Sequence, residues 1–119
     1  RIGWSGDFYT SSDVHPILGQ ALAKQAQQLD ACLGHPDPFT VVEMGPGKGL
    51  LARDFLTACQ NAPANLSERL RYILIERSAS MRAQQHEHVA PWIGRAGHVA
   101  WLDRLEDGRI CSLFEGDCF

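Results

Sequence analysis

The sequence predicts an α/β fold in which helices flank a parallel β-sheet. Three observations carry this prediction: short β-branched and apolar runs alternate with segments of helical periodicity, a glycine-rich loop joins the first strand to a helix, and an acid closes the second strand. Strands that alternate with helices pair in parallel through right-handed crossovers. We expect a partial sheet, truncated near its fourth strand, because the sequence starts at Arg1 and residues 117–119 resemble the opening of a strand.

Residues 1–38 are expected to form an irregular N-terminal segment followed by one helix. The polar residues 11–13 offer a helix N-cap, and Gly34 offers a stop. Between them, residues 14–33 carry apolar side chains at helical spacing. We expect the buried face of this helix to consist of Ile17, Leu18, Leu22, Ala26, Leu29 and Cys32.

Residues 39–119 are expected to form a βαβαβ core within the same domain. Buried parallel strands are short apolar runs, and the helices between them show one apolar face. The predicted strands are Phe39–Met44, Leu70–Ile75 and His98–Leu102, with a fourth starting at Asp117–Phe119. The predicted helices are Leu50–Asn61 and a segment that is capped by Ser78 or Ser80 and ends near Val89, with a linker at 62–68.

The strongest chemical signal is the segment Glu43-Met44-Gly45-Pro46-Gly47-Lys48-Gly49. It follows a predicted strand and opens a predicted helix, where peptide N–H groups and the helix dipole favour an anionic group. Glycines let a ligand approach the backbone closely. The segment therefore predicts a ligand-binding loop, although glycine turns between a strand and a helix also occur for structural reasons alone.

Other glycine loops differ from this one in spacing. The dinucleotide-binding fingerprint has its third glycine three places after the second, at position 50, where this chain has Leu50. A Walker loop has Ser or Thr after its Gly-Lys pair, whereas Lys48 is followed by Gly49. A nicotinamide-dependent dehydrogenase is therefore disfavoured, and a Walker-type nucleotide site is excluded.

Glu76 closes the second predicted strand and is the natural partner of the glycine loop. It comes 27 residues after Gly49 (76 minus 49). An acid at this place in a doubly wound fold accepts hydrogen bonds from ribose hydroxyls, although an acid there can also be merely solvated. Loop and acid together favour a ligand that contains a ribose.

The composition restricts partners and compartment. A net charge of −3 gives no broad positive surface, so we expect no nucleic-acid partner. No membrane span or signal peptide is recognisable, so we expect a cytoplasmic protein without membrane contact. We expect no metal, because His86 and His88 are two residues apart and point away from each other on a helix. The cysteines form no C-x-x-C pair and are expected to be reduced core thiols: Cys32, Cys59, Cys111 and Cys118.

Three segments carry a family resemblance: Gly6–Ser11 (G-D-F-Y-T-S) with Val14-His15-Pro16 behind it, Val42–Gly49, and Tyr72–Ser78. Together they resemble the MidA-type S-adenosylmethionine-dependent methyltransferases, over nearly the whole chain. The glycine loop alone would indicate only the class I methyltransferase superfamily. The G-D-F-Y-T-S segment narrows the resemblance to the MidA-type family. Where the family usually has S-P-E, this chain has Ser11-Ser12-Asp13, which keeps a capping hydroxyl and an acid.

The resemblance implies a class I, Rossmann-like methyltransferase domain that binds S-adenosylmethionine. The mitochondrial member of the family is a complex I assembly factor that acts as a protein arginine methyltransferase, so a protein acceptor, and arginine in particular, is implied. Residues 1–119 would be the cofactor-binding part of the domain. We assign no catalytic residue, because the family builds its acceptor pocket largely from a later region.

The resemblance also implies cofactor contacts in the loop and at two acids. Glu76 would take the ribose hydroxyls, and Glu43 would act through water or by fixing the loop. The loop residues implied to bind the cofactor are Gly45, Pro46, Gly47 and Gly49. The first three would surround its methionine part.

The resemblance implies further cofactor contacts near the start of the chain and after the third predicted strand. Asp7 would meet the cofactor's ammonium group, and Phe8 or Tyr9 would pack near its sulfonium. The competing interpretation is a capping loop whose aromatic residues only seal the core. Leu102 or Asp103, just after the third strand, would border the adenine, unless Asp103 belongs to a solvated charged loop.

Two alternatives to a methyltransferase remain open. The chain could keep the fold and the cofactor as a non-catalytic binding or assembly module, because a fold does not establish a function. A dehydrogenase fragment is the less favoured alternative. A partial sheet would also expose an apolar edge, which predicts self-association or marginal stability.

Overall fold

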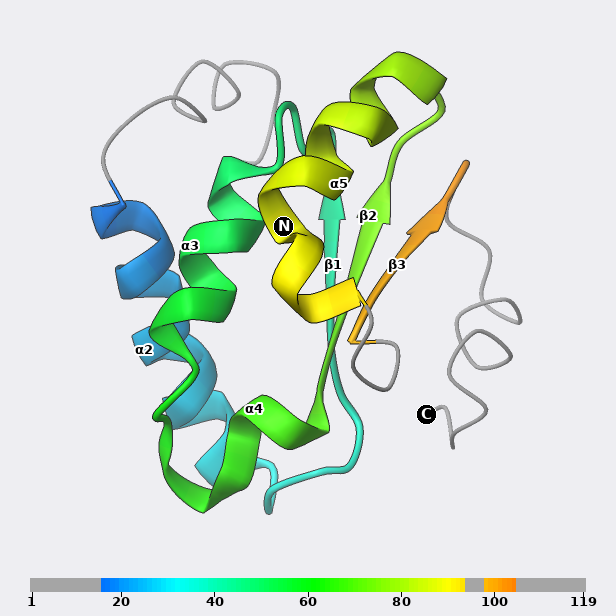
Figure 1. Cartoon of the computed structure of the whole chain (residues 1–119). Helices are drawn as coiled ribbons and strands as arrows, with labels where there is room; N and C mark the ends of the chain where they lie inside the picture. Colours follow the sequence, from blue (N-terminus) through cyan, green and yellow to red (C-terminus); the bar gives the residue numbers. More distant parts are fainter. Residues whose placement is uncertain (1–15, 94–97, 105–119) are drawn as a thin grey trace.

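The computed structural model describes residues 16–93 and 98–104, and within them it shows a three-stranded parallel sheet with helices packed on one face (Figure 1). The strands are β1 (Phe39–Met44), β2 (Leu70–Ile75) and β3 (Val99–Leu102). The helices are α2 (Ile17–Cys32), α3 (Leu50–Ala58), α4 (Leu66–Arg69) and α5 (Ala79–Ile93), with a 3₁₀ turn, η2, at Pro63–Asn65. The predicted α/β class and its first three strands are confirmed. The predicted N-cap at 11–13 and the strand start at 117–119 lie outside the described residues.

The strands lie in the order β1-β2-β3, and both neighbouring pairs are parallel. Met44 pairs with Ile75, and Ile75 pairs with Leu102. The three strands therefore end level with one another. Whatever follows each strand in the sequence is delivered to the same edge of the sheet.

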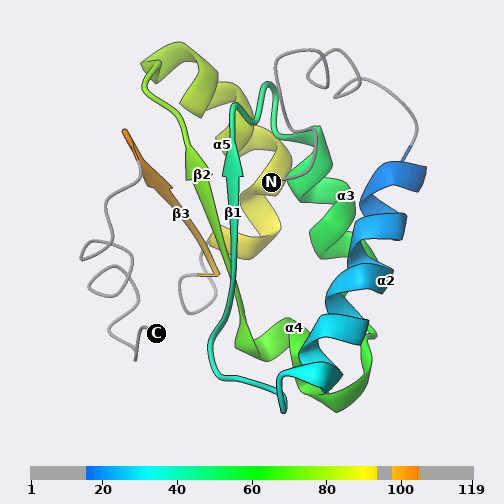
Figure 2. The same ribbon diagram turned by 180° about the vertical axis from the view of Figure 1, so that it is seen from behind.

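The two faces of the sheet differ in cover. On the helix side, Tyr72 and Leu74 of β2 pack with Phe55 and other residues of α3 in the main buried cluster. On the other side, Ile73, Ile75 and Leu102 form a second buried cluster. Figure 2 shows that none of the described helices lies over this second face. Two apolar side chains of β1 remain open on it, Val42 at 37% and Met44 at 47% exposure.

The buried face of α2 differs from the predicted one. Ile17 and Leu29 are 62% and 52% exposed, and the residues that are buried are Gly19, Ala23, Ala26 and Asp30. A Cβ added at Gly19 would lie 2.6 Å from the Cβ of Asp54 in α3. The two helices approach so closely that only small side chains fit between them. The prediction is therefore correct for Ala26 and partly for Leu22, and wrong for Ile17, Leu29 and Cys32, which are exposed.

The cysteine prediction is half correct within the described residues. Cys59, after α3, is buried in the main cluster, whereas Cys32 is exposed at the end of α2. Both are free thiols. Cys32 is exposed because it lies on the side of α2 that faces away from α3. Cys111 and Cys118 lie outside the described residues.

The connection between α3 and β2 is more ordered than predicted. α3 ends at Ala58 rather than Asn61, and the expected linker contains η2 and α4. Ala64 and Asn65 adopt left-handed backbone conformations, with φ of 60° and 55°. These two residues turn the chain sharply, so that the single turn of α4 runs directly into β2.

α5 begins as predicted and extends further. The Ser78 hydroxyl accepts the Met81 N–H at 3.2 Å, which confirms the expected N-cap. The helix passes the predicted end at Val89, whose φ of −108° makes a kink before Pro91. The last turn then places Trp92 against the main buried cluster. Among the described residues, no helix combines the length and apolarity needed to cross a membrane.

A buried ion pair fixes the edge of the sheet at which the strands begin. Asp30, 2% exposed at the end of α2, accepts two hydrogen bonds from Arg69, at 2.7 and 2.8 Å. Arg69 directly precedes β2 and also donates to the carbonyls of Pro36 and Ala64, at 2.8 and 2.7 Å. His35 Nδ1 lies 2.9 Å from the same carboxylate. We call Asp30, His35 and Arg69 the ion-pair cluster.

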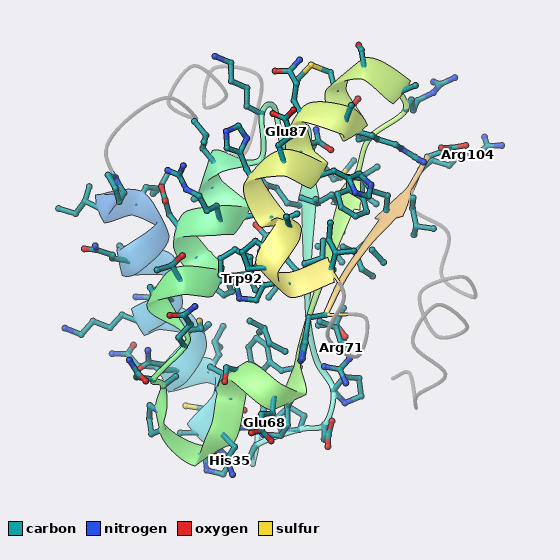
Figure 3. The ribbon with its side chains drawn as sticks, viewed as in Figure 1. His35, Glu68, Arg71, Glu87, Trp92 and Arg104 are labelled. Atoms are coloured by element: carbon teal, nitrogen blue, oxygen red, sulfur yellow. The ribbon has the colours of Figure 1, made fainter. Side chains whose placement is uncertain are left out.

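The ion-pair cluster has the electrostatics of a structural contact. Hydrogen bonding to the Arg69 guanidinium holds the pKa of Asp30 at about 2, well below its usual 3.8. The cluster joins α2, the loop before β1 and the η2–α4 turn. His35 and Glu68 mark this edge in Figure 3, and Arg104 marks the opposite one.

Candidate functional site

The predicted site residues follow the level ends of the three strands. The loop Gly45–Gly49 comes after β1, Glu76 after β2 and Asp103 after β3. In Figure 1 the three strand arrows point toward this edge. Ligands of open α/β sheets bind outside the carboxyl ends of the strands. The fold thus gathers at one edge side chains that are distant in the sequence.

The loop requires its glycines for backbone reasons. Gly45, Gly47 and Gly49 have φ values of 67°, 58° and 88°, which residues with a Cβ rarely adopt. The Gly49 N–H donates to the Pro46 carbonyl at 3.0 Å, and Gly49 is the N-cap of α3. Pro46 is fully buried, Gly45 is exposed and Gly47 is half-buried. A ligand would therefore meet the backbone of the two glycines rather than the proline ring.

Both oxygens of the Glu76 carboxylate are held by neighbours. Oε2 accepts the backbone N–H of Ser78 at 3.0 Å, and Oε1 accepts a hydrogen bond from Nε2 of Gln85, also at 3.0 Å. The Glu76 N–H donates to the Leu102 carbonyl at 2.9 Å, which extends the β2–β3 pairing by one step. Each carboxylate oxygen keeps a second lone pair. The acid is thus fixed in place and can still accept hydrogen bonds from a diol.

α5 holds the loop through two side chains that are not among the predicted site residues. Gln85 donates to the Gly47 carbonyl at 2.6 Å, and His88 Nδ1 lies 2.8 Å from the Lys48 carbonyl oxygen. A Cβ added at Gly49 would lie 3.1 Å from the Gln85 Cα. The helix therefore packs directly against the loop, and the third glycine is needed for that approach as well as for its φ angle.

Arg82, on the same helix, joins the ends of β2 and β3. Its Nε donates to the Glu76 backbone carbonyl at 2.7 Å, and its guanidinium forms an ion pair with Asp103. The Asp103 side chain is 68% exposed and, with Arg77 and Arg104, lines a pocket at this edge. Asp103 is thus oriented by Arg82 and remains accessible from solvent.

These α5 residues could not have been assigned from the sequence alone. Arg82, Gln85 and His88 are spaced by three residues and share one side of the helix. Polar residues at that spacing ordinarily indicate a solvated face. Gln84 and Gln85 are adjacent and identical, yet only Gln85 is buried. Its burial depends on strands that are distant in the sequence.

Glu43 lies beneath the loop, on the helix side of β1. Its Oε1 accepts a hydrogen bond from the Tyr72 hydroxyl at 2.8 Å. Burial raises the pKa of Glu43 from 4.5 to about 7, and the Tyr72 hydrogen bond opposes that rise. The pKa of Tyr72 is raised well above 10 by its own burial and by Glu43. This contact joins the ends of β1 and β2, and the expected role of Glu43 in fixing the loop stays a prediction.

Two predicted contacts cannot be placed. Asp7 and Phe8 lie outside the described residues, so their role stays a prediction.

The geometry of the remaining residues defines a class of protein. It is an α/β protein whose first strand ends in a glycine loop and whose second strand ends in an acid, as in proteins that bind ribose-containing cofactors.

The chain belongs to a family of S-adenosylmethionine-dependent methyltransferases. The family model described as "Putative S-adenosyl-L-methionine-dependent methyltransferase" matches residues 17–119. This match includes all the described strands and helices. It agrees with the resemblance inferred from the sequence motifs.

Two curated relatives are similar over about half of the chain. One is the mitochondrial protein arginine methyltransferase NDUFAF7 homolog of Drosophila melanogaster, 43% identical over 54 residues, which are 45% of this chain and 12% of the relative. The other is the mitochondrial protein arginine methyltransferase NDUFAF7 of Xenopus laevis, 35% identical over 60 residues, or 50% and 14% of the two chains. The match thus spans about an eighth of these relatives.

Two solved structures from Burkholderia thailandensis share the fold. One, described as a "likely methyl transferase" bound to S-adenosyl-homocysteine, is 32% identical with a TM-score of 0.63, covering 82% of this chain and 24% of that one. The other, an uncharacterized protein of the same superfamily, is also 32% identical, with a TM-score of 0.61 over 87% and 26% of the chains. This similarity confirms the predicted class I fold.

Proposed function

We propose that this chain binds S-adenosylmethionine at the carboxyl edge of its sheet and forms the cofactor-binding part of a protein methyltransferase. The observation that carries the proposal is the placement of Gly45–Gly49 and Glu76 at the level ends of neighbouring strands. Membership of the methyltransferase family supports the identity of the ligand.

The described residues fit this cofactor. The accessible backbone at Gly45 and Gly47 leaves room for the methionine part, and the N-terminal end of α3 favours its carboxylate. Glu76 has free lone pairs for the two ribose hydroxyls. Asp103, just after β3, stays a proposed neighbour of the adenine. Asp7 and Phe8 stay proposed contacts of the ammonium group and the sulfonium.

When bound, the cofactor supplies a methyl group that is already activated by a positively charged sulfur. The residues of this chain bind and orient. The glycine loop and Glu76 would hold the two ends of one ligand, and Glu43, through Tyr72, would fix the strand end beneath the loop. Orientation of this kind is a large part of catalysis when the leaving group is intrinsically reactive. We assign removal of the acceptor's proton to no residue.

The proposed acceptor is a protein, and more specifically an arginine side chain. The support comes from the names of the two curated relatives, both protein arginine methyltransferases. A non-catalytic module that binds the cofactor is the alternative, because the match spans only about an eighth of those relatives. Transfer of labelled methyl groups to arginine in a protein extract would favour the enzyme, and binding without transfer would favour the module.

The test of cofactor binding is thermal unfolding of the chain with saturating S-adenosylhomocysteine, with NAD, and without ligand. A ligand that binds only the folded state raises stability by about 2.7 kcal/mol at one hundred times its Kd. We expect a rise of several degrees with S-adenosylhomocysteine alone, lost in Glu76→Ala and kept in Glu87→Ala. Glu87 is an exposed acid on α5 and is labelled in Figure 3. An equal rise with NAD would contradict the proposal.

We also propose that copies of this chain associate through β1. Within the described residues β1 pairs with β2 alone, so its other edge has no strand partner there. Two apolar side chains of β1, Val42 and Met44, are exposed. Light scattering should show a dimer that Met44→Lys weakens, and a stable monomer would contradict this.

The cytoplasm stays the expected compartment. Fractionation decides it, because the curated relatives are named mitochondrial.

A further inference from the structure

We propose that Gln85 is a positioning residue for cofactor binding, which ties the glycine loop to Glu76 and sets the orientation of that carboxylate. This role rests on the proposed function. Gln85 lies on α5, a helix with no predicted ligand contact. Through Gln85, this helix would set the distance between the glycine loop and Glu76, which would hold opposite parts of one ligand.

The Gln85 side chain uses both of its donors and one acceptor site of its oxygen. It is 0% exposed. Nε2 donates one hydrogen to the Gly47 carbonyl at 2.6 Å and the other to Glu76 Oε1 at 3.0 Å. Its Oε1 accepts the indole N–H of Trp101 at 2.8 Å. A single buried amide therefore joins β3, the residue after β2 and the loop after β1.

The chemistry of the partners fixes which way the amide faces. The Trp101 indole can only donate, and the Gly47 carbonyl and the Glu76 carboxylate can only accept. The oxygen of Gln85 must face Trp101, and its nitrogen must face the other two. Trp101 is itself held by the His86 ring, which stacks on it with ring centres 4.1 Å apart and 6° between planes. The amide thus has one arrangement that satisfies every partner.

Alternative side chains at this position would fail for definite reasons. Methionine has nearly the same length but would leave the Gly47 carbonyl and the Trp101 N–H without partners. Glutamate would place a second carboxylate about 3 Å from that of Glu76, where two negative charges repel strongly. A glutamine amide supplies both the length and the two donors.

The first experiment measures S-adenosylhomocysteine affinity by calorimetry in the chain and in Gln85→Met. We expect about tenfold weaker binding, in the range that loss of buried hydrogen bonds ordinarily gives. Gln84→Met, on the exposed side of the same helix, is the matched control and should bind like the parent. Circular dichroism at the same temperature shows that each variant is folded when its affinity is measured.

The second experiment separates positioning from a merely structural role through a pH profile of affinity in Gln85→Glu. We expect weak binding at pH 8 and recovery toward the parent value at pH 5.5, because the introduced carboxyl, once protonated, can again donate to Glu76. The other ionisable side chains near the site, Glu43, His86 and His88, are the same in both proteins, so the affinity ratio of variant to parent at each pH is the quantity compared. A purely structural role predicts a ratio that does not change with pH.

The outcomes are distinct. A parent chain that does not bind S-adenosylhomocysteine overturns the proposed function and this role with it. A parent that binds, with folded Gln85→Met and Gln85→Glu binding equally well at all pH values, overturns the role of Gln85 alone. Tenfold loss in Gln85→Met together with pH-dependent recovery in Gln85→Glu supports it.

Discussion

The two edges of the sheet each contain an acid with little access to solvent, Asp30 buried and Glu43 half-buried, and the pKa values of the two are shifted in opposite directions. Where the strands begin, Asp30 meets the Arg69 guanidinium, which holds its pKa at about 2. Where they end, Glu43 has only the Tyr72 hydroxyl as a side-chain partner among the described residues, and burial raises its pKa to about 7. Within the described part of the chain, Asp30 is thus paired with a cation and Glu43 is not.

This difference indicates which edge is structural and which is functional. A buried carboxylate with a bidentate cationic partner holds segments together and titrates far from neutral pH. A buried carboxyl without a cation lowers stability near neutral pH, and such groups concentrate at functional sites. The edge with Glu43 is also where the glycine loop, Glu76 and Gln85 converge. We therefore assign stability to the first edge, and the second is the edge at which we propose ligand binding.

The largest expected effect is on stability at the structural edge. Asp30→Asn leaves the Arg69 charge buried without its partner, and loss of one member of a buried ion pair costs about 3 kcal/mol. Urea unfolding measures this loss. Glu68→Gln, an exposed acid at the same edge, should change stability little. If the comparison is correct, folded Asp30→Asn binds S-adenosylhomocysteine like the parent, and a large loss of affinity would contradict it.

The next effect is a pH dependence that comes from Glu43. Because its folded pKa lies above 4.5, the folded state binds the proton more tightly, so this stabilisation is present below about pH 4.5 and is lost as pH rises through about 7. The loss is on the order of 3 kcal/mol. Glu43→Gln should remove it, so the stability of the variant relative to the parent rises between pH 5 and pH 8. Paired urea titrations at the two pH values check this, and a constant difference would refute the assignment.

A matched pair of glycine substitutions compares the edges directly. Gly34 and Gly49 have similar φ values, 81° and 88°, but an added Cβ meets nothing within 4 Å at Gly34 and meets Gln85 at 3.1 Å at Gly49. Gly34→Ala should cost about 1 kcal/mol for the left-handed backbone alone. Gly49→Ala should cost about 2 kcal/mol, with weaker ligand binding. Thermal unfolding measures both, and equal losses would show that the approach of α5 does not restrict position 49.

A smaller effect than those of Asp30→Asn and Glu43→Gln is expected from Tyr72→Phe. It removes one hydroxyl, whose hydrogen bond lowers the pKa of Glu43, so that pKa should rise above about 7. The loss of stability should be about 1 kcal/mol at pH 5. It should be larger at pH 8, where the ionised Glu43 of the parent accepts the Tyr72 hydrogen bond. Carboxyl carbon shifts in an NMR titration follow the pKa. A pKa that falls in the variant would mean that Tyr72 acts through another group.

The parts of the molecule that could be predicted are those encoded by neighbouring residues. The strands Phe39–Met44 and Leu70–Ile75, the glycine loop between strand and helix, and Glu76 at a strand end are local patterns. The buried face of α2 is not local, because it is set by the close approach of α3 at Gly19. Besides the expected Ala26, this approach buries Gly19 and Ala23, and it leaves Ile17 and Leu29 exposed.

Long-range polar contacts were also beyond prediction. Asp30 and Arg69 are 39 residues apart, and Gln85 reaches Gly47 across 38 residues. Nothing in the local sequence around either residue distinguishes a buried polar side chain from a solvated one. The sequence motifs locate the residues proposed to meet the ligand, and the residues that hold those residues in place emerge only from the fold.

The most direct test of the central claim is an NMR titration of the ¹⁵N-labelled chain with S-adenosylhomocysteine. We expect shifts of the backbone amides at Gly45, Gly47, Gly49 and Ser78, with little change at Leu33 and His35 at the ion-pair cluster. No shift at the glycine loop, or shifts centred on the ion-pair cluster, would contradict the assignment of the carboxyl edge as the cofactor site.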